Sequence, residues 1–419
     1  METNSIFTDS KVVSNPFDVR GYARMLMGNF VGTLALWTVR LALAFYVWNV
    51  SGSAFWSTAV VAAQFIPSAA FGPLFGVIVD RVRFRAALVA AVAVTFSGYL
   101  ATMACFMLGI ASPWTLCLTS LWLGLGGAMY TPVRLVLPTV VVPKSALAKA
   151  IANSAISFNL TRVLGPLLGA VLISLVGVSS TVLFAVCCYV FFIVVVTTLP
   201  FASPQTSTEQ DEASFRRRFL AGARYVLSSR DLRLYLVITV LGSMFVRTFG
   251  ELVPAINGIK FAGTELGLSL LTTALAVGAI LCGLAFSLLR QSKDLVIKAM
   301  LLGLWVGPLT GLVLVFGDAF WLILICLIVN GFMSSMAGLG SQTLLQTSMD
   351  SSFRARVMSI WASLTVGTVG LSASISGAAI DLVGFETTLI ALTIIGTAVG
   401  WYLTLRHWPN AKNEVSNSI

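Results

Sequence analysis

The chain consists of long apolar stretches separated by short polar ones, from one end to the other. About 20 predominantly apolar residues are enough for a helix to cross the hydrocarbon core of a bilayer. The stretches are rich in Gly, Ala, Leu and Val, and they lack the sustained two-residue alternation of transmembrane β-strands. We therefore predict an all-α membrane protein with twelve transmembrane helices, over residues 21–48, 54–79, 86–110, 114–136, 146–176, 179–200, 232–257, 266–289, 295–316, 319–344, 357–380 and 387–405.

Composition supports this prediction and excludes several classes of protein. Of the 419 residues, 58% are hydrophobic and only 10% are charged, whereas soluble domains carry about 25% charged residues. A soluble enzyme, a disordered chain and a nucleic-acid-binding module are excluded on this ground. The single histidine is His407, near the end of the chain, and no Gly-rich phosphate loop is present. We expect no cofactor, no metal site and no enzymatic activity.

The basic residues predict the orientation in the membrane. Of the 26 Lys and Arg, 22 fall in one set of loops, if the N-terminus is cytoplasmic. The opposite loops contain only Lys260, and the remaining three lie within predicted helices. Positive residues accumulate on the cytoplasmic side of membrane proteins. The sequence thus predicts a multi-pass protein of the cell inner membrane with both termini cytoplasmic, and the net charge of +10 needs no nucleic-acid partner to explain it.

One long cytoplasmic loop divides the twelve predicted helices into two sets of six. We expect an N-terminal six-helix bundle over residues 1–200, a linker over 201–231, and a C-terminal bundle over 232–419. The linker begins as a flexible polar segment. From residue 215 it alternates basic and apolar residues, which predicts an amphipathic helix lying at the cytoplasmic interface.

The two halves resemble each other at an offset of about 208 residues. Leu137 aligns with Leu345, Thr139 with Thr347, and Gly169 with Gly377. Repeats of the same orientation give two bundles related by an axis along the membrane normal, and transporters of this kind hold their substrate between the bundles near the midplane.

Several motifs resemble those of a known superfamily. The loop after the second predicted helix contains Gly76, Asp80, Arg81 and Arg85, and it resembles the signature loop of the major facilitator superfamily, with Arg83 and Phe84 as departures. Further segments are similar to the transmembrane secretion effector branch, which includes siderophore and macrolide exporters: residues 46–53, 63–67, 147–154, 159–169 and 354–359. The resemblance covers nearly the whole chain and implies the major facilitator fold.

Two of these motifs imply roles in conformational switching. The group Gly76, Asp80, Arg81 and Arg85 is expected at the cytoplasmic ends of the bundles, where a carboxylate can pair with a neighbouring Arg and with helix N-terminal amides. This predicts a gate latch; the alternative is a topology signal with a weak surface ion pair. Gly165, Pro166 and Gly169 resemble the export motif of antiporters, although small residues at this spacing also serve ordinary helix packing.

Four charged residues inside predicted helices are the candidates for binding and coupling. Charges within the membrane are rare and usually face a cavity or a partner. Arg162 lies mid-helix, and it either binds an anionic substrate or ties neighbouring helices together. Arg40, Arg247 and Glu251 are expected at a common depth in helices that correspond in the repeat. Glu251 is either a proton-coupling site, with Arg40 or Arg247 competing with the proton, or part of an outer ion pair with Arg247.

Together these features predict a secondary active transporter that exports a small organic molecule, siderophore-like or drug-like, by alternating access and proton antiport. Its expected partners are that molecule, the proton and the lipid bilayer, and the protein is expected to be a monomer. A proton-coupled uptake carrier and a non-transporting scaffold with the same fold are the alternatives.

Overall fold

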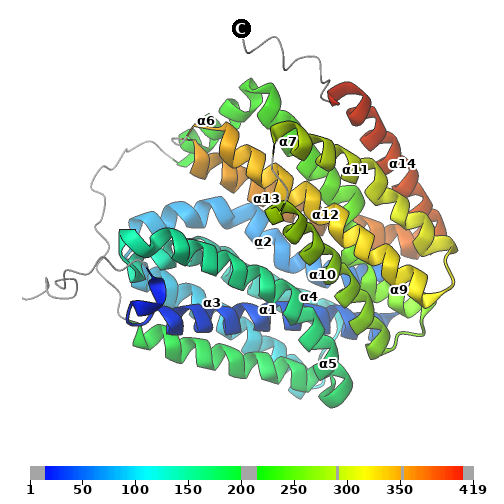
Figure 1. Ribbon diagram of the computed structural model, residues 1–419. Coiled ribbons are helices and arrows are strands. Elements are labelled where there is room, and N and C mark those ends of the chain that lie inside the picture. Colours follow the sequence, from blue (N-terminus) through cyan, green and yellow to red (C-terminus); the bar gives the residue numbers. More distant parts are fainter. Residues whose placement is uncertain (1–14, 200–214, 289–291, 351–352, 409–419) are drawn as a thin grey trace, which may run out of the picture.

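The computed structural model describes residues 15–199, 215–288, 292–350 and 353–408, and within them it contains helices and no strand. The helices form two groups that diverge from one another (Figure 1). The first group is η1 (Pro16–Asp18), α1 (Tyr22–Ser51), α2 (Ala54–Arg81), α3 (Phe84–Met107), α4 (Pro113–Val141) and α5 (Lys144–Thr198). The second comprises α6 (Phe215–Ser228), α7 (Arg230–Gly242), η2 (Ser243–Arg247), α8 (Thr248–Glu251), α9 (Val253–Lys260), α10 (Glu265–Leu288), α11 (Lys293–Phe316), α12 (Phe320–Ser348), α13 (Arg354–Val383) and α14 (Phe385–His407).

Twelve membrane crossings are accounted for within these residues. Eleven stretches are long and apolar enough to cross a membrane. One of them, α5, contains a break at Gly177, where φ is +79° and ψ is 171°, a conformation open to glycine but strained for other residues. This break divides α5 into two crossings, so the twelve predicted spans and the all-α prediction are confirmed.

The seventh crossing is less regular than the sequence indicates. It runs through α7, the π-helical turn η2, α8 and α9 instead of forming one continuous helix. A π-helical turn widens the backbone locally, and such turns occur frequently at functional sites. Arg247 is the last residue of this turn, and Glu251 ends the short helix that follows it.

The boundary between the two bundles repeats the internal symmetry. The first bundle contributes α2 and α5, which pack against α13 and α10 of the second. An offset of about 208 residues relates α2 to α10 and α5 to α13. Each bundle therefore uses the same pair of helices at the boundary, as expected for two pseudo-symmetric six-helix bundles.

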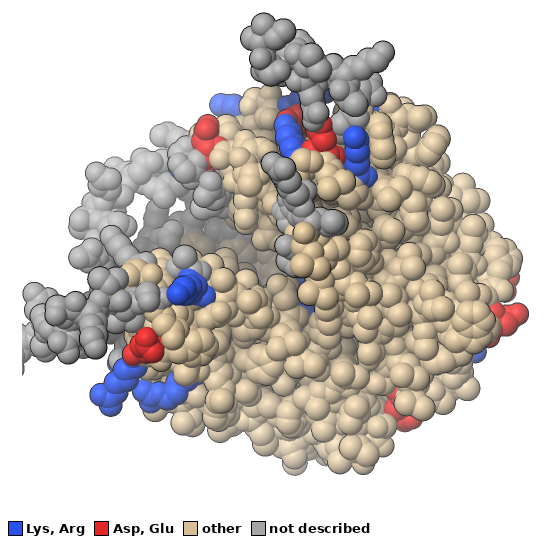
Figure 2. Space-filling view, in the orientation of Figure 1, with Lys and Arg blue, Asp and Glu red and all other residues tan. Residues whose placement is uncertain are grey.

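The two ends of the molecule differ in charge and in packing. We call the end that carries Arg24, Arg85 and Arg233 the basic end, and the opposite one the far end. At the far end, one hydrophobic core contains residues of both bundles, such as Phe45 of α1 and Phe249 of α8. A second core runs along the first bundle and a third lies in the part of the second bundle toward the basic end, and each belongs almost entirely to its own bundle. Figure 2 shows a hollow between the bundles on the side where Lys and Arg gather.

The helix predicted in the linker is present as α6, and its C-terminal part docks onto the second bundle. The Tyr225 ring stacks on Phe353 with centroids 4.2 Å apart, and its hydroxyl donates to Asp350 Oδ2 at 3.3 Å. Gly222 lies against Arg356 at the start of α13. The first part of the linker, residues 201–214, lies outside the described residues.

Candidate functional site

Arg40 is a buried residue of the first bundle, and several neighbouring side chains hold it in position. Its side chain is 8% exposed, and its Nε donates to Gln64 Oε1 of α2 at 3.1 Å. The guanidinium carbon lies 4.4 Å from the ring centroid of Trp37 and 4.2 Å from that of Phe65. Cation–π contacts of this length stabilise a desolvated guanidinium. Gln64 is fixed in turn by Ser120 of α4, with Nε2 and Oγ 3.5 Å apart.

Arg162 lies in the middle of α5 but is exposed. Its guanidinium carbon is 5.6 Å from the Trp37 ring centroid, and the side chain interacts electrostatically with Arg40, Arg247 and Glu251. Because two of these charges belong to the second bundle, the exposed Arg162 side chain is inferred to point toward the boundary between the bundles and not toward the surrounding lipid.

Arg247 and Glu251 come from the second bundle, on η2 and α8, and both are half-buried. Arg40 interacts electrostatically with both of them, although it belongs to the first bundle. The structure thus brings together the four intramembrane charges that the sequence singled out. In the described part of the chain the one ion pair within 4 Å is Lys293–Asp231, at the basic end. The four charges therefore act on each other at longer range.

The glycines of the predicted export motif hold α5 against α1. A Cβ at Gly169 would lie 3.0 Å from the Thr38 carbonyl oxygen, and one at Gly165 would overlap the Trp37 side chain. Thr38 Oγ1 donates to the Gly165 carbonyl oxygen at 3.1 Å, and α5 continues through Pro166 as a helix. The close approach places Trp37 between Arg40 and Arg162, while the export role of the motif stays a prediction.

The predicted cytoplasmic gate is only partly described. Gly76 faces open space, because nothing lies within 4 Å of a Cβ built on it, and Arg85 is exposed. The side chains of Asp80 and Arg81, at the end of α2, lie outside the described residues. The latch role of this group stays a prediction.

A second carboxylate, Asp381 of α13, joins the bundles at the far end, and the sequence analysis missed it. Its Oδ1 accepts from the Ala54 backbone N–H at 2.9 Å, and its Oδ2 accepts from that of Phe55 at 3.1 Å and from the Ser53 hydroxyl. These donors form the N-terminus of α2, where a negative charge is favoured by the helix dipole. One signal was available: Asp381 lies in the last turn of its own helix, where an acidic residue is disfavoured unless other donors hold it.

Comparison with known proteins agrees with this architecture. The family model of the transmembrane secretion effectors matches residues 13–419. Macrolide efflux protein A of Streptococcus pyogenes is 21% identical over 379 residues, covering 88% of this chain and 93% of that protein. The protein of the same name from Enterococcus faecalis is 22% identical over 304 residues, covering 72% and 93%.

Solved structures show the same fold at low sequence identity. The nucleoside transporter NupG superposes with a TM-score of 0.70 at 12% identity, covering 92% of this chain and 98% of that one. A bacterial homologue of the human lysosomal transporter Spinster, in an inward-facing and unoccupied conformation, gives 0.69 at 13% identity, with 92% and 97% covered. Since the family model spans nearly the entire sequence, the chain belongs to the transmembrane secretion effector family of major facilitator transporters.

Proposed function

We propose that this protein exports a small organic molecule across the cell inner membrane by alternating access, in exchange for protons. The observation that carries the proposal is the charge cluster between the bundles. Arg40 and Arg162 come from one bundle and Arg247 and Glu251 from the other, and they interact across the boundary that must open and close during transport.

The arrangement of the two ends supports an inward-open state. The positive-inside rule makes the basic end cytoplasmic, and the hollow lies at that end while the far end is closed. Switching requires α2 and α13 to part at the far end, so Asp381 must release the N-terminus of α2. In the opposite state, Asp80 and Arg81 at the other end of α2 would meet the start of α13 and form the predicted cytoplasmic latch.

The relatives narrow the kind of molecule to be tested. Because macrolide efflux proteins match most of the chain, a macrolide is the first drug-like probe. A siderophore-like molecule is the other, because the arginines between the bundles suit acidic oxygen groups. Spent medium from iron-limited cells with and without the gene should differ in an iron chelator if the siderophore is the cargo.

Glu251 is the proposed site of proton coupling. In the described part of the membrane-spanning helices it is the carboxylate that interacts with both arginines of the other bundle. Proton binding would neutralise Glu251 and remove its attraction to Arg40 and Arg162, which favours separation of the bundles. After the cargo has been released, the return of the transporter to the inward-open state would thereby be coupled to movement of a proton into the cell.

The test uses inverted membrane vesicles and a labelled macrolide, or the identified chelator if there is one. We expect Glu251→Gln to abolish accumulation driven by a pH gradient, while exchange of labelled for unlabelled substrate continues. Glu386→Gln is the matched control, since Glu386 is an exposed acidic residue in the first turn of α14. Full gradient-driven accumulation by the Glu251 variant would contradict the coupling role, and absence of any transport by the unmodified protein would contradict the export function.

A further inference from the structure

The charge cluster between the bundles carries an excess of positive charge. It contains three arginines and one carboxylate, so that two positive charges remain uncompensated even when Glu251 is ionised. Within a membrane protein such an excess is costly unless a counter-charge is supplied. Among the described residues no acidic side chain, Glu251 included, lies within ion-pair distance of these arginines.

Two buried donors at this place have no acceptor. Arg40 Nη1 and Trp37 Nε1 are both shielded from solvent and without a hydrogen-bond partner among the described residues. Buried donors are nearly always paired in native proteins, so that an unpaired one calls for a specific explanation. The two donors lie on adjacent side chains, since the Arg40 guanidinium stacks on the Trp37 ring.

The arginine is held in position by its neighbours. Gln64 fixes Nε, and the rings of Trp37 and Phe65 hold the guanidinium carbon at 4.4 and 4.2 Å. Its conformational freedom is therefore already lost before any ligand arrives, which favours binding. Arg162, on the same tryptophan at 5.6 Å, is exposed and able to reach a ligand that enters from the hollow.

We propose that Trp37, Arg40 and Arg162 form the binding site for an acidic oxygen group of the exported molecule, with a carboxylate as the best match. Two guanidinium groups and an indole N–H all donate and none accepts. A carboxylate supplies two acceptor oxygens and the missing negative charge, and guanidinium–carboxylate hydrogen bonds are among the strongest in proteins. The apolar faces of Trp37 and Phe65 suit an aromatic or aliphatic body attached to that group.

An anionic cargo is compatible with proton exchange at Glu251. The attraction between Glu251 and the arginines of the other bundle is weakened from one side when a proton neutralises the carboxylate. It is weakened from the other side when a cargo carboxylate occupies Arg40 and Arg162. Either event alone releases the same contact between bundles, so the cargo can permit one direction of switching and the proton the other.

The inference rests on the proposed export function for its biological meaning, but its test requires only binding. The purified full-length protein in lipid nanodiscs is titrated with 2-naphthoate and with 2-naphthamide, which has the same ring and no charge. We expect the acid to bind at least about tenfold more tightly than the amide, because only the acid compensates the positive charge.

Variants locate the site. Arg162→Gln and Arg40→Gln should each reduce acid affinity by about tenfold or more and leave amide affinity unchanged. Arg162 is exposed, so its variant should fold even if the Arg40 variant does not. Trp37→Phe keeps an aromatic ring, though a smaller one, removes the indole donor, and should give a smaller loss of acid affinity. Arg224→Gln, on an exposed arginine of α6, is the matched control.

Each outcome bears on one proposal at a time. Equal or absent binding of acid and amide overturns the anion site, and so does acid binding that survives Arg162→Gln. Equal or absent binding is the result expected if a water molecule, shared with the unpaired Tyr99 hydroxyl, already satisfies Arg40 Nη1. Tighter binding of 2-naphthoate than of 2-naphthamide, without transport of the macrolide or the chelator in vesicles, would leave the anion site standing and overturn the export function. Transport in vesicles without that preference would leave the export function standing and overturn the anion site.

Discussion

The two ends of the α2–α13 pair differ in how they are joined. These helices run antiparallel along the boundary between the bundles, and at the far end Asp381 of α13 binds the N-terminus of α2. Small residues continue the contact inward: Gly377 lies against Ala54, and Gly370 against Ala62 and Phe65. Farther along α2, Gly72 and Gly76 face open space.

The difference between the two ends indicates which part of the contact between α2 and α13 has to open during transport. Helices that pack over half of their length and separate over the other half can rock about the middle of the contact without losing it altogether. The far end carries both close packing and a charged hydrogen-bond acceptor, so under the proposed alternating access it would be the closed gate in this state. The comparison can be tested by disturbing one end and not the other.

The largest effect is expected from Gly377→Val at the closed end. A Cβ there would lie 2.6 Å from the Ala54 carbonyl oxygen and would overlap the Thr58 hydroxyl. Overpacking of a tight contact costs about 1–3 kcal/mol, which corresponds to a shift in the balance of the two states toward opening at the far end by about fivefold to more than a hundredfold. Spin labels at Val50 and Val383, both exposed, would report a longer distance in a background lacking the native cysteines.

The matched control for this experiment is Gly72→Val. The same side chain is added on α2, at a position with nothing within 4 Å. We expect it to leave the distance between Val50 and Val383 unchanged, and to oppose closure of the basic end during transport. Equal effects of the two variants on the far-end distance would contradict the assignment of that end as the closed gate.

A smaller shift is expected from Asp381→Asn. The amide keeps one acceptor oxygen but loses the negative charge that the N-terminus of α2 favours. Since Asp381 is exposed, solvent screening reduces the loss to about 1 kcal/mol, or roughly fivefold in the population of the closed state. The same spin-label pair measures it. Glu386→Gln, an exposed acidic residue close to Asp381 in sequence, should give no shift, and a shift of similar size there would point to a general charge effect.

The hydrophobic pattern and the charges predicted most of the fold. Apolar length located the crossings, and even the division of α5 at Gly177 follows from the gap between the predicted spans 146–176 and 179–200. Depth along the helix axis grouped Arg40, Arg247 and Glu251, because a helix rises by a constant 1.5 Å per residue. The electrostatic interactions among them agree with that grouping.

The features that the sequence did not predict depend on how the helices pack against one another. Gln64 is one of many polar residues within the spans, and nothing local marks it as the partner of Arg40. The hydrogen bonds of Asp381 join residues more than 300 positions apart, so they require the packing of α13 on α2 to be known. The π-helical turn at 243–247 depends on backbone accommodation within the bundle, for which residue type gives no clear signal.

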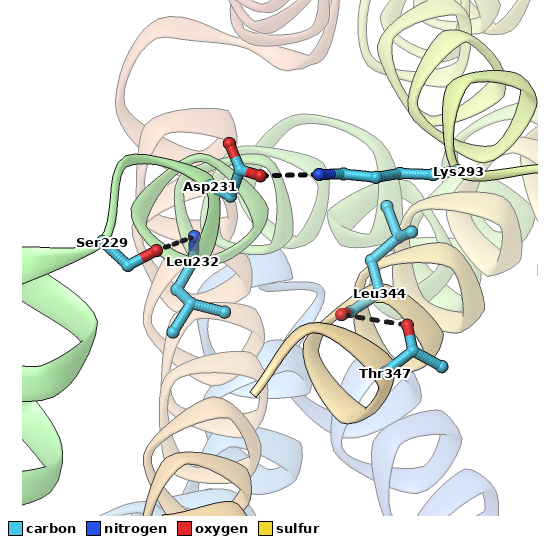
Figure 3. Close-up of polar contacts among 6 residues, drawn as sticks. All are labelled: Ser229, Asp231, Leu232, Lys293, Leu344 and Thr347. Carbon is cyan, nitrogen blue, oxygen red and sulfur yellow. Dashed lines mark hydrogen bonds and ion pairs between the residues drawn. The ribbon is translucent and has the colours of Figure 1, made fainter. Parts of the chain in front are cut away.

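The smallest effect is expected at an ion pair that lies within one bundle. Lys293 Nζ of α11 is 2.7 Å from Asp231 Oδ2 of α7 at the basic end (Figure 3), and the two side chains are 54% and 51% exposed. An exposed pair of this kind contributes at most about 1 kcal/mol. Both helices belong to the second bundle and move together, so the contact is present in either state.

Asp231→Asn should therefore lower the midpoint of thermal unfolding slightly and leave transport and the distance between Val50 and Val383 unchanged. The side chain of Ser229 still caps the first turn of α7 by accepting from Leu232 N–H at 3.4 Å, so the helix start is preserved in this variant. If Asp231→Asn changed the gate distance as much as Asp381→Asn does, net charge rather than position at the bundle boundary would control the state. A gate contact must join parts that separate, and of these two carboxylates only Asp381 does so.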